Sequence, residues 1–365
     1  MSQYQFCVAI ARSTPTSYQD GQSPARGSRI ASSWHHTKNL TNAGYMRRIL
    51  LLTAKLLISA ALLYFSLRKV NLSELASRLD ITSVGWIGLA IAVTFFQIFL
   101  GALRWREISA ACGAPLAATQ ALRFNLIGAF FNQTLPSSIG GDAVRLWLVA
   151  RHGAGWRAAT YSIFDDRALG LIALAVLVVA SLPWTYKLVE DPEGRSALLF
   201  VDFAALAAGA GFLILGRLPW LWLKRWWGTH HLHACSVIAN RLIFSYRHGP
   251  KLAVLSLVIH ILAAVIAWCV ARSIAAPVLF AQVLLLVPPV MLITMVPISI
   301  AGWGVREASM GLAFGYAGLA ASEGVDVSLL FGATYFVLGA FGGLIWIFSA
   351  EKAAQGTASI EVVPE

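Results

Sequence analysis

The chain contains few charged residues, and acidic residues are the scarcer class. Only 12% of its 365 residues are charged, whereas a soluble domain has about 25%. It has 17 aspartates and glutamates against 28 lysines and arginines. This shortage of charge, together with a hydrophobic share of 58%, excludes an ordinary soluble domain and indicates a polytopic membrane protein.

The sequence also lacks the residue groups typical of metal sites, covalent catalysis and nucleic-acid binding. Its four cysteines include no Cys-x-x-Cys pair, and we interpret them as small apolar residues. His230, His231 and His233 have no acidic ligand at metal-binding spacing, so we interpret them as a solvated basic loop. There is no GxSxG, P-loop or HExxH motif, and no basic run alternates with aromatic residues. We therefore expect no cofactor, no metal and no nucleic-acid partner.

The apolar residues fall in segments of about 20, the length with which a helix crosses the hydrocarbon of a bilayer. Because no alternating strand pattern accompanies them, we expect an all-α protein with about six to eight membrane segments. The predicted spans are 49–67, 84–103, 118–135, 168–186, 197–215, 252–271, 278–296 and 327–348. The basic excess is explained by the positive-inside rule and by anionic lipid surfaces.

The two ends differ from this apolar middle. Residues 1–45 are polar and predicted to be disordered, and 351–365 form a short tail. Met46 precedes two arginines and an apolar stretch, so it is a candidate for the true initiator. The membrane domain is therefore predicted to cover 46–350.

Two short motifs occur twice in the same order. The pattern P-x-S-I-x-G-x-x-V-R begins at Pro136 and again at Pro297, and A-P-x-x-x-x-Q-x-L begins at Ala114 and again at Ala276. A duplicated helix-breaking motif is how many transporters build a central site. The sequence therefore predicts two internal repeats, 46–186 and 197–350.

The charge of the loops favours an inverted arrangement of these repeats. Loops 145–167 and 217–251 are basic and predicted to be cytoplasmic, whereas loop 187–196 is more acidic and predicted to be external. Placing the other basic residues inside as well requires 118–135 to be re-entrant rather than spanning. The alternative is a pair of parallel repeats in which 118–135 and 278–296 cross the membrane fully.

The first motif copy suits an anion. Proline is expected to end a helix at Leu135, and Asp142 is expected to cap the next helix. The N–H groups of that helix attract negative charge, and Arg145 can add a bidentate phosphate contact. The second copy repeats the pattern. The alternative is a structural helix connection with interfacial arginines.

Further polar residues stand at the edges of or inside apolar segments. Asn132 must find a partner in the bundle or line a cavity, and Asp165 to Arg167 form either an interfacial ion pair or part of a site. His260 is interpreted as a hydrogen-bonded core residue. The candidate binding residues are Asn132, Ser138, Gly140, Gly141, Asp142, Arg145, Asp165, Asp166, Arg167, Ser299, Gly302, Gly304, Arg306 and Glu307.

The segments 132–145, 165–170 and 297–307 together resemble the flippase-like transmembrane family that includes the membrane half of lysylphosphatidylglycerol synthetase. The resemblance implies a multi-pass protein of the inner membrane that moves or handles lipids. Bifunctional members carry a soluble transferase domain after the membrane part. Only 351–365 follow the last span here, so we expect no synthetase activity.

We therefore expect transbilayer movement of a phospholipid or a lipid-linked headgroup, with anionic membrane lipids as the partners. Two alternatives stay open. One is a membrane-embedded lipid-modifying enzyme, with Asp165, Asp166 or Glu307 as acid–base groups. The other is an accessory subunit of an envelope-lipid synthesis complex.

Overall fold

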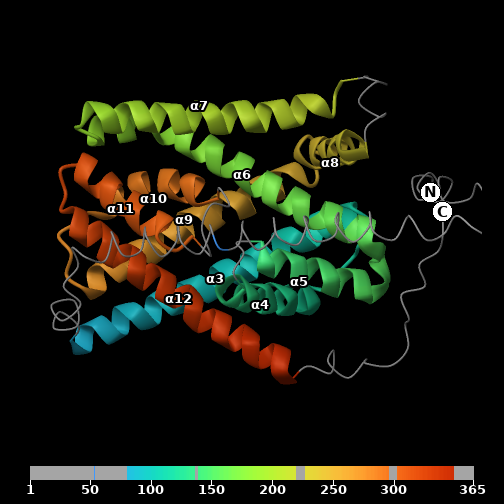
Figure 1. The fold of residues 1–365 in the computed structure, drawn as a ribbon, viewed down its shortest axis with the longest axis horizontal. Helices are drawn as coiled ribbons and strands as arrows, with labels where there is room; N and C mark the ends of the chain where they lie inside the picture. Colours follow the sequence, from blue (N-terminus) through green and yellow to red (C-terminus); the bar gives the residue numbers. More distant parts are fainter. Residues whose placement is uncertain (1–52, 54–79, 136–138, 219–226, 296–301, 349–365) are drawn as a thin grey trace, which may run out of the picture. The chain divides into compact units, whose positions relative to one another are not determined.

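A computed structural model describes residues 53, 80–135, 139–218, 227–295 and 302–348 of the chain. Within these residues every regular element is a helix, which confirms the all-α prediction (Figure 1). The elements are α3 (Ile81–Ala111), α4 (Ala118–Thr134), α5 (Gly140–Val149), the π-helical turn η1 (Ala150–Ala154), α6 (Gly155–Leu188), α7 (Pro192–Leu215), α8 (Trp227–Ile243), α9 (Gly249–Ser273), α10 (Phe280–Thr294), α11 (Val305–Tyr316) and α12 (Ala321–Phe348).

The predicted spans agree well with these helices. In the described part of the chain, five segments are long and apolar enough to cross a membrane: α3, the stretch Gly140–Leu188, α7, α9 and α12. The stretch Gly140–Leu188 comprises α5, η1 and α6 and is kinked at Gly153. The protein is therefore a multi-pass membrane protein. The predicted disordered stretch 1–45, the candidate start at Met46, the first span 49–67 and the tail 351–365 lie outside the described residues.

Short sequence signals set where several helices begin. The Asp80 carboxylate precedes α3 and accepts the Ser83 N–H at 2.9 Å, and hydrogen bonds from Thr82 and Ser83 lower the Asp80 pKa to about 2. The duplicated glutamines act similarly at two other helices. Gln120 accepts the backbone N–H that precedes α4, and Gln282 accepts the one that precedes α10, at 2.9 and 2.8 Å.

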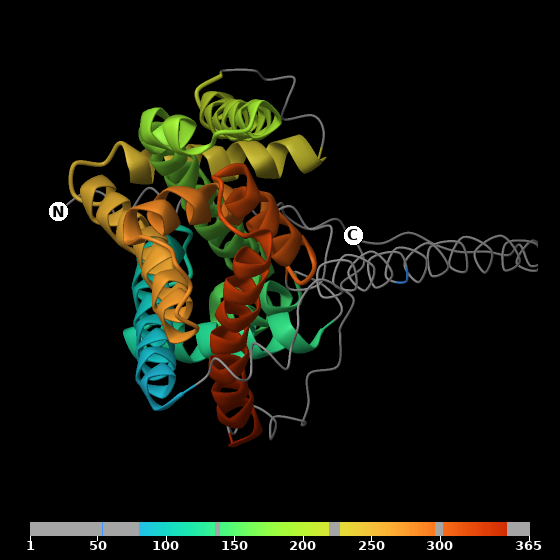
Figure 2. The same ribbon diagram turned by 90° about the vertical axis from the view of Figure 1, so that its left-hand side faces the viewer.

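The helices pack in two prominent pairs, α3 along α9 and α4 along α12 (Figure 2). Small residues allow this close approach, as is usual in membrane bundles. A Cβ added to Gly342 of α12 would come 1.8 Å from the Leu126 carbonyl oxygen of α4, so only glycine fits there. Smaller contacts join α6 to α10 and α4 to α5.

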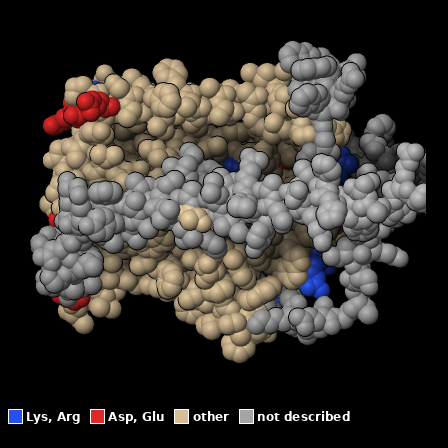
Figure 3. All heavy atoms as spheres, in the orientation of Figure 1, with Lys and Arg blue, Asp and Glu red and all other residues tan. Residues whose placement is uncertain are grey.

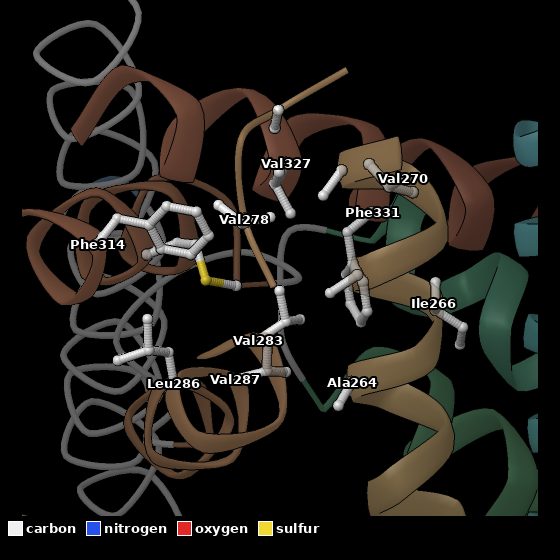
Figure 4. Close-up of a cluster of buried hydrophobic side chains, with 14 of the residues drawn as sticks. Ala264, Ile266, Val270, Val278, Val283, Leu286, Val287, Phe314, Val327 and Phe331 are labelled. Atoms are coloured by element: carbon white, nitrogen blue, oxygen red, sulfur yellow. The ribbon is translucent and has the colours of Figure 1, made fainter. Parts of the chain in front are cut away.

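An apolar core lies where α9, α10, α11 and α12 meet (Figure 4). Val283 and Val287 of α10 point toward Phe331 of α12, and all three are buried. Because lipid tails are as apolar as these side chains, close van der Waals packing rather than water exclusion holds this core together.

The described surface in Figure 3 is mostly uncharged, with most of the charge near its ends. Phe200 and Phe203 of α7 are 75% and 69% exposed, as expected of side chains that face lipid. On the face shown, acidic residues gather where α6 leads into α7, and basic residues gather near α5.

Candidate functional site

The candidate site is built on a tight hairpin between α4 and α5. The helix α4 ends at Thr134, one residue before the predicted end, and α5 folds back along it. A Cβ on Gly141 would lie 2.1 Å from the Gly128 carbonyl oxygen, so the backbones of the two helices touch. Asn132 closes the turn, because its Oδ1 accepts the Gly141 N–H at 2.9 Å.

Asp142 has a different role from the one predicted. The residue before α5 is Ile139, with no side-chain cap, so the expectation that Asp142 caps this helix was wrong. Its carboxylate instead accepts hydrogen bonds from two arginines, Arg145 at 3.1 Å and Arg167 at 2.7 Å. At the start of α5, the Gly141 N–H is one of the backbone groups without a partner inside the helix, and it donates to Asn132 of α4 in place of the predicted cap.

Asp166 of α6 extends this group into a network. Its Oδ1 lies 3.0 Å from a guanidinium nitrogen of Arg104, and its Oδ2 lies 3.3 Å from Arg145. Asp142, Arg145 and Asp166 are all buried. The two carboxylates and the three guanidinium groups, those of Arg104, Arg145 and Arg167, carry a net charge of +1 when all are ionised.

Arg145 stands at the centre of the network. Its guanidinium carbon lies 4.0 Å from the centre of the Trp105 ring, and it pairs with both Asp142 and Asp166. Its buried Nε has no hydrogen-bond partner among the described residues. A guanidinium that is positioned by an aromatic ring and has an N–H group without a partner among the described residues is well suited to bind an anionic group.

The network opens on a cavity of about 270 Å³ inside the bundle. Its walls come from α3, α4, α5, α6, α9 and α12, and it is also reached by Met295 just after α10. The polar lining includes Arg104, Asn132, Gln133, Arg145, Asp166 and Arg167. His260 also lines it, with Nε2 3.0 Å from the Gly170 carbonyl oxygen, which agrees with its interpretation as a hydrogen-bonded core residue.

The second motif copy forms a closed cluster of its own. Arg306 pairs with the neighbouring Glu307 at 2.7 Å, and Ser328 donates to Glu307 at 2.9 Å. The Glu307 carboxylate also accepts the Gly304 N–H at 2.6 Å, which secures the start of α11. Its charges are therefore satisfied within the cluster.

One hydrogen bond joins the two regions. The indole N–H of Trp303, in the second copy, donates to Gln133 Oε1 at 3.2 Å. Trp303 also lies under the Arg306 guanidinium, 4.9 Å from ring centre to carbon. Gln133 lines the cavity, so the second copy contacts the cavity wall without contributing its arginine.

The predicted site residues are thus divided among three places. The first group meets at the cavity or at the hairpin behind it: Asn132, Gly140, Gly141, Asp142, Arg145, Asp166 and Arg167. Gly302, Gly304, Arg306 and Glu307 belong to the second copy. Asp165 is buried apart from both, with Oδ2 3.7 Å from the Cys112 thiol, and Ser138 and Ser299 lie outside the described residues.

Arg104 is not among the predicted site residues, because the predicted span 84–103 ends one residue before it. It lies within α3 and bonds to Asp166 and to Ser256 of α9. The available signal was an arginine inside a continuous helical segment, because such a residue needs a partner in the bundle. Nothing in the residue pattern singles out Asp166 as that partner.

The donor set of the site suits an anion rather than a metal. The described residues contain no group of three or more histidine, cysteine, aspartate or glutamate side chains that could hold a metal ion. The prediction that His230, His231 and His233 lie in a solvated loop was wrong, because all three belong to helix α8. His231 Nδ1 lies 2.6 Å from the Tyr161 hydroxyl.

Comparison with protein-family models gives a match over most of the chain. Residues 52–343 match the model described as the lysylphosphatidylglycerol synthase TM region. Neither a comparison with curated protein sequences nor one with solved structures gives a match. The match covers the hairpin, the arginine network and both motif copies. The chain therefore belongs to the lysylphosphatidylglycerol synthase transmembrane-region family.

Proposed function

We propose that this protein moves a phospholipid or lipid-linked headgroup across the bilayer, with the arginine-lined cavity as the headgroup site. The observation that carries this proposal is the position of three arginines at a cavity lined largely by helices long and apolar enough to span a membrane. Ionisable residues at membrane depth are rare, and they mark substrate or ion pathways. Membership of a lipid-related membrane family supports the same interpretation.

The size of the cavity supports a headgroup rather than a whole lipid. Sites for drug-sized molecules occupy roughly 300–1,000 Å³, and this cavity occupies about 270 Å³. The acyl chains would therefore stay in the surrounding hydrocarbon while the headgroup passes through the protein. The net charge of +1 and the spare Arg145 Nε favour an anionic group such as a phosphate.

The two aspartates would then act as exchangeable partners. Asp142 and Asp166 pair with the three arginines in the structure, so that none of these guanidinium groups is left without a carboxylate. A phosphate entering the cavity would take over part of their hydrogen bonds, and the aspartates would recover them when it leaves. Such exchange allows the headgroup to bind without being trapped.

We further propose that the two motif copies belong to inverted repeats with re-entrant helices. The duplicated glutamines cap α4 and α10 in the same way, and both helices lead into a short helix packed against them. With 17 and 15 residues, α4 and α10 are shorter than the ~20 residues of a typical span. The ends of the described surface differ in charge. Because basic residues favour the cytoplasmic side, this difference supports an orientation in the inner (cytoplasmic) membrane in which α5 faces the cytoplasm.

The test is a pair of arginine substitutions in the full chain. Purified protein is reconstituted in vesicles of phosphatidylethanolamine and phosphatidylglycerol that carry a fluorescent phosphatidylglycerol. Dithionite added outside destroys only the outer-leaflet label, so label crossing the bilayer is read as continued loss of fluorescence. Arg145→Gln removes the central cation and should slow crossing at least about tenfold, the effect of losing about 1.4 kcal/mol of binding.

Arg151→Gln is the matched control. Arg151 is exposed, and its guanidinium carbon also stacks on a tryptophan, 4.8 Å from the Trp147 ring. It does not line the cavity, so its substitution should leave the rate unchanged. Equal rates for the wild type and Arg145→Gln would refute the site, and a new covalent lipid product would favour the enzyme alternative.

A further inference from the structure

Asp202 places a carboxyl group in the middle of α7. The residue is 2% exposed, and neither carboxylate oxygen has a hydrogen-bond partner among the described residues. It is the eleventh residue of Pro192–Leu215, about 15 Å along a helix that rises about 1.5 Å per residue. This is close to half the thickness of the hydrocarbon.

The described helices α6 and α10 both pack against α7. Neither has an ionisable side chain at the level of Asp202. In α7 itself, the stretch 196–215 contains no ionisable residue besides Asp202, and Arg195 lies seven residues, about 10 Å, away. In α6, residues 168–185 contain none, and α10 contains none. At the level of Asp202, these three described helices therefore supply no cation to balance a negative charge.

The third neighbour, α8, does carry histidines, Cys235 and Arg241, but it bonds to α7 elsewhere. Its hydrogen bonds are to the Phe212 and Leu213 carbonyl groups, at least ten residues along α7 from Asp202. These groups are about 15 Å away along the helix axis. The hydrogen bonds that join α8 to α7 therefore lie near the end of α7 and not at Asp202.

The surroundings of Asp202 are apolar, and two of the helices that form them also reach the cavity. Val201 and Ala205, its neighbours on α7, pack against Leu174 of α6 and Leu292 of α10. Both of these helices continue to the cavity, α6 through Gly170 and α10 through Met295. A change in packing at Asp202 would therefore move elements that form the cavity wall.

We propose that Asp202 is a proton-binding site that couples lipid movement to the proton gradient. A carboxylate to which the described residues offer neither a cation at its level nor a hydrogen-bond donor is strongly disfavoured at this depth, so the group holds a proton. Release of that proton to water creates an unpaired charge that α7, α6 and α10 must rearrange to solvate. Proton uptake and release at one oxygen thus switch the packing beside the cavity.

The coupling rests on the proposed lipid movement, whereas the proton site does not, so the experiment has two readouts. The first is the infrared band of a protonated carboxylic C=O, measured on the purified full chain at neutral pH. Asp202→Asn should remove one component of this band. Asp191→Asn is the control, because Asp191 caps the start of the same helix through the Gly194 N–H. An identical band in the wild type and Asp202→Asn would overturn the proposal.

The second readout is lipid crossing in the vesicles described above, with a pH difference imposed across the membrane. The wild-type rate should change by up to about tenfold per pH unit, the limit for one proton, and the Asp202→Asn rate should not change with the gradient. A variant that follows the gradient like the wild type would overturn the coupling. Absence of crossing in every protein would refute the lipid function instead, and the infrared result would still decide the proton site.

A measurement on the unaltered protein covers the case in which Asp202→Asn does not fold. Dicyclohexylcarbodiimide reacts with protonated carboxyl groups in apolar surroundings, and mass spectrometry locates its adduct. An adduct on Asp202 and none on Asp191 is expected. Recovery of the Asp202 peptide entirely unmodified would overturn the proposal.

Discussion

Replacing Asp166 by asparagine tests the arginine network directly. The side chain keeps its shape but loses the charge that lies between two guanidinium groups, 3.0 Å from Arg104 and 3.3 Å from Arg145. The net charge of the network rises from +1 to +2. Both arginines keep other partners, since Arg104 also bonds to Ser256 and Arg145 to Asp142.

The size of the effect follows from burial. Removing one partner of a buried ion pair costs about 3–5 kcal/mol, because the other charge is left uncompensated. The remaining partners and the Trp105 ring under Arg145 place this variant at the lower end, so we expect the free energy of unfolding to fall by about 3 kcal/mol. An anion that binds the site restores stability by mass action, about 2.7 kcal/mol at a concentration of about 100 Kd.

The assay is unfolding of the purified protein in detergent micelles, followed by tryptophan fluorescence with and without added phosphatidylglycerol. Asp166→Asn should be destabilised in neutral detergent and should recover most of the loss with the anionic lipid. Asp191→Asn, at the partly exposed start of α7, should change little under either condition. Failure of phosphatidylglycerol to stabilise Asp166→Asn more than the wild type would refute the view that the network binds an anion.

Three further substitutions and one control test a close helix contact, an ion pair and a hydrogen bond. Gly342→Ala places a methyl group against the backbone of α4 and should destabilise the protein by about 3 kcal/mol, whereas Gly211→Ala, with nothing within 4 Å, should be neutral in the same unfolding assay. Glu307→Gln leaves Arg306 without its carboxylate and should cost about 3–5 kcal/mol without a specific response to phosphatidylglycerol. Trp303→Phe removes one hydrogen bond to α4 and should cost about 1 kcal/mol; a tenfold fall in lipid crossing with unchanged stability would instead place this residue in the transport path.

The helices were predictable because their signals are local. Runs of about 20 apolar residues located them, and Pro136 marked the end of α4. The boundaries were less accurate where charge lies inside a helix. Helix α6 starts at Gly155, although the prediction began at 168, after the Asp165–Arg167 triplet. Hydropathy treats those charges as a membrane edge, whereas Asp166 is buried and paired with arginines of α3 and α5, and Arg167 is paired with Asp142 of α5.

The two motif copies show how far a site can be inferred from its residues. Arg145 and Arg306 occupy the same place in the pattern, yet only the first lines the cavity. Arg306 has Glu307 as its next residue and pairs with it. The corresponding position in the first copy is Leu146, so Arg145 takes its second carboxylate from Asp166, 21 residues away. The residue that follows the motif therefore decides whether the arginine pairs with its own neighbour, as Arg306 does, or with a carboxylate of another helix, as Arg145 does.

Local patterns along the chain are sufficient to establish the membrane class, the helical segments and the helix break before α5. Each of these depends on residues within a few positions of one another or on average composition. The folded bundle alone reveals which charges meet, that Asp142 binds arginines rather than a helix end, and that Asp202 has no hydrogen-bond partner among the described residues. Those outcomes depend on contacts between distant helices, and in a low-dielectric interior the partner of a charge sets its energy and its use.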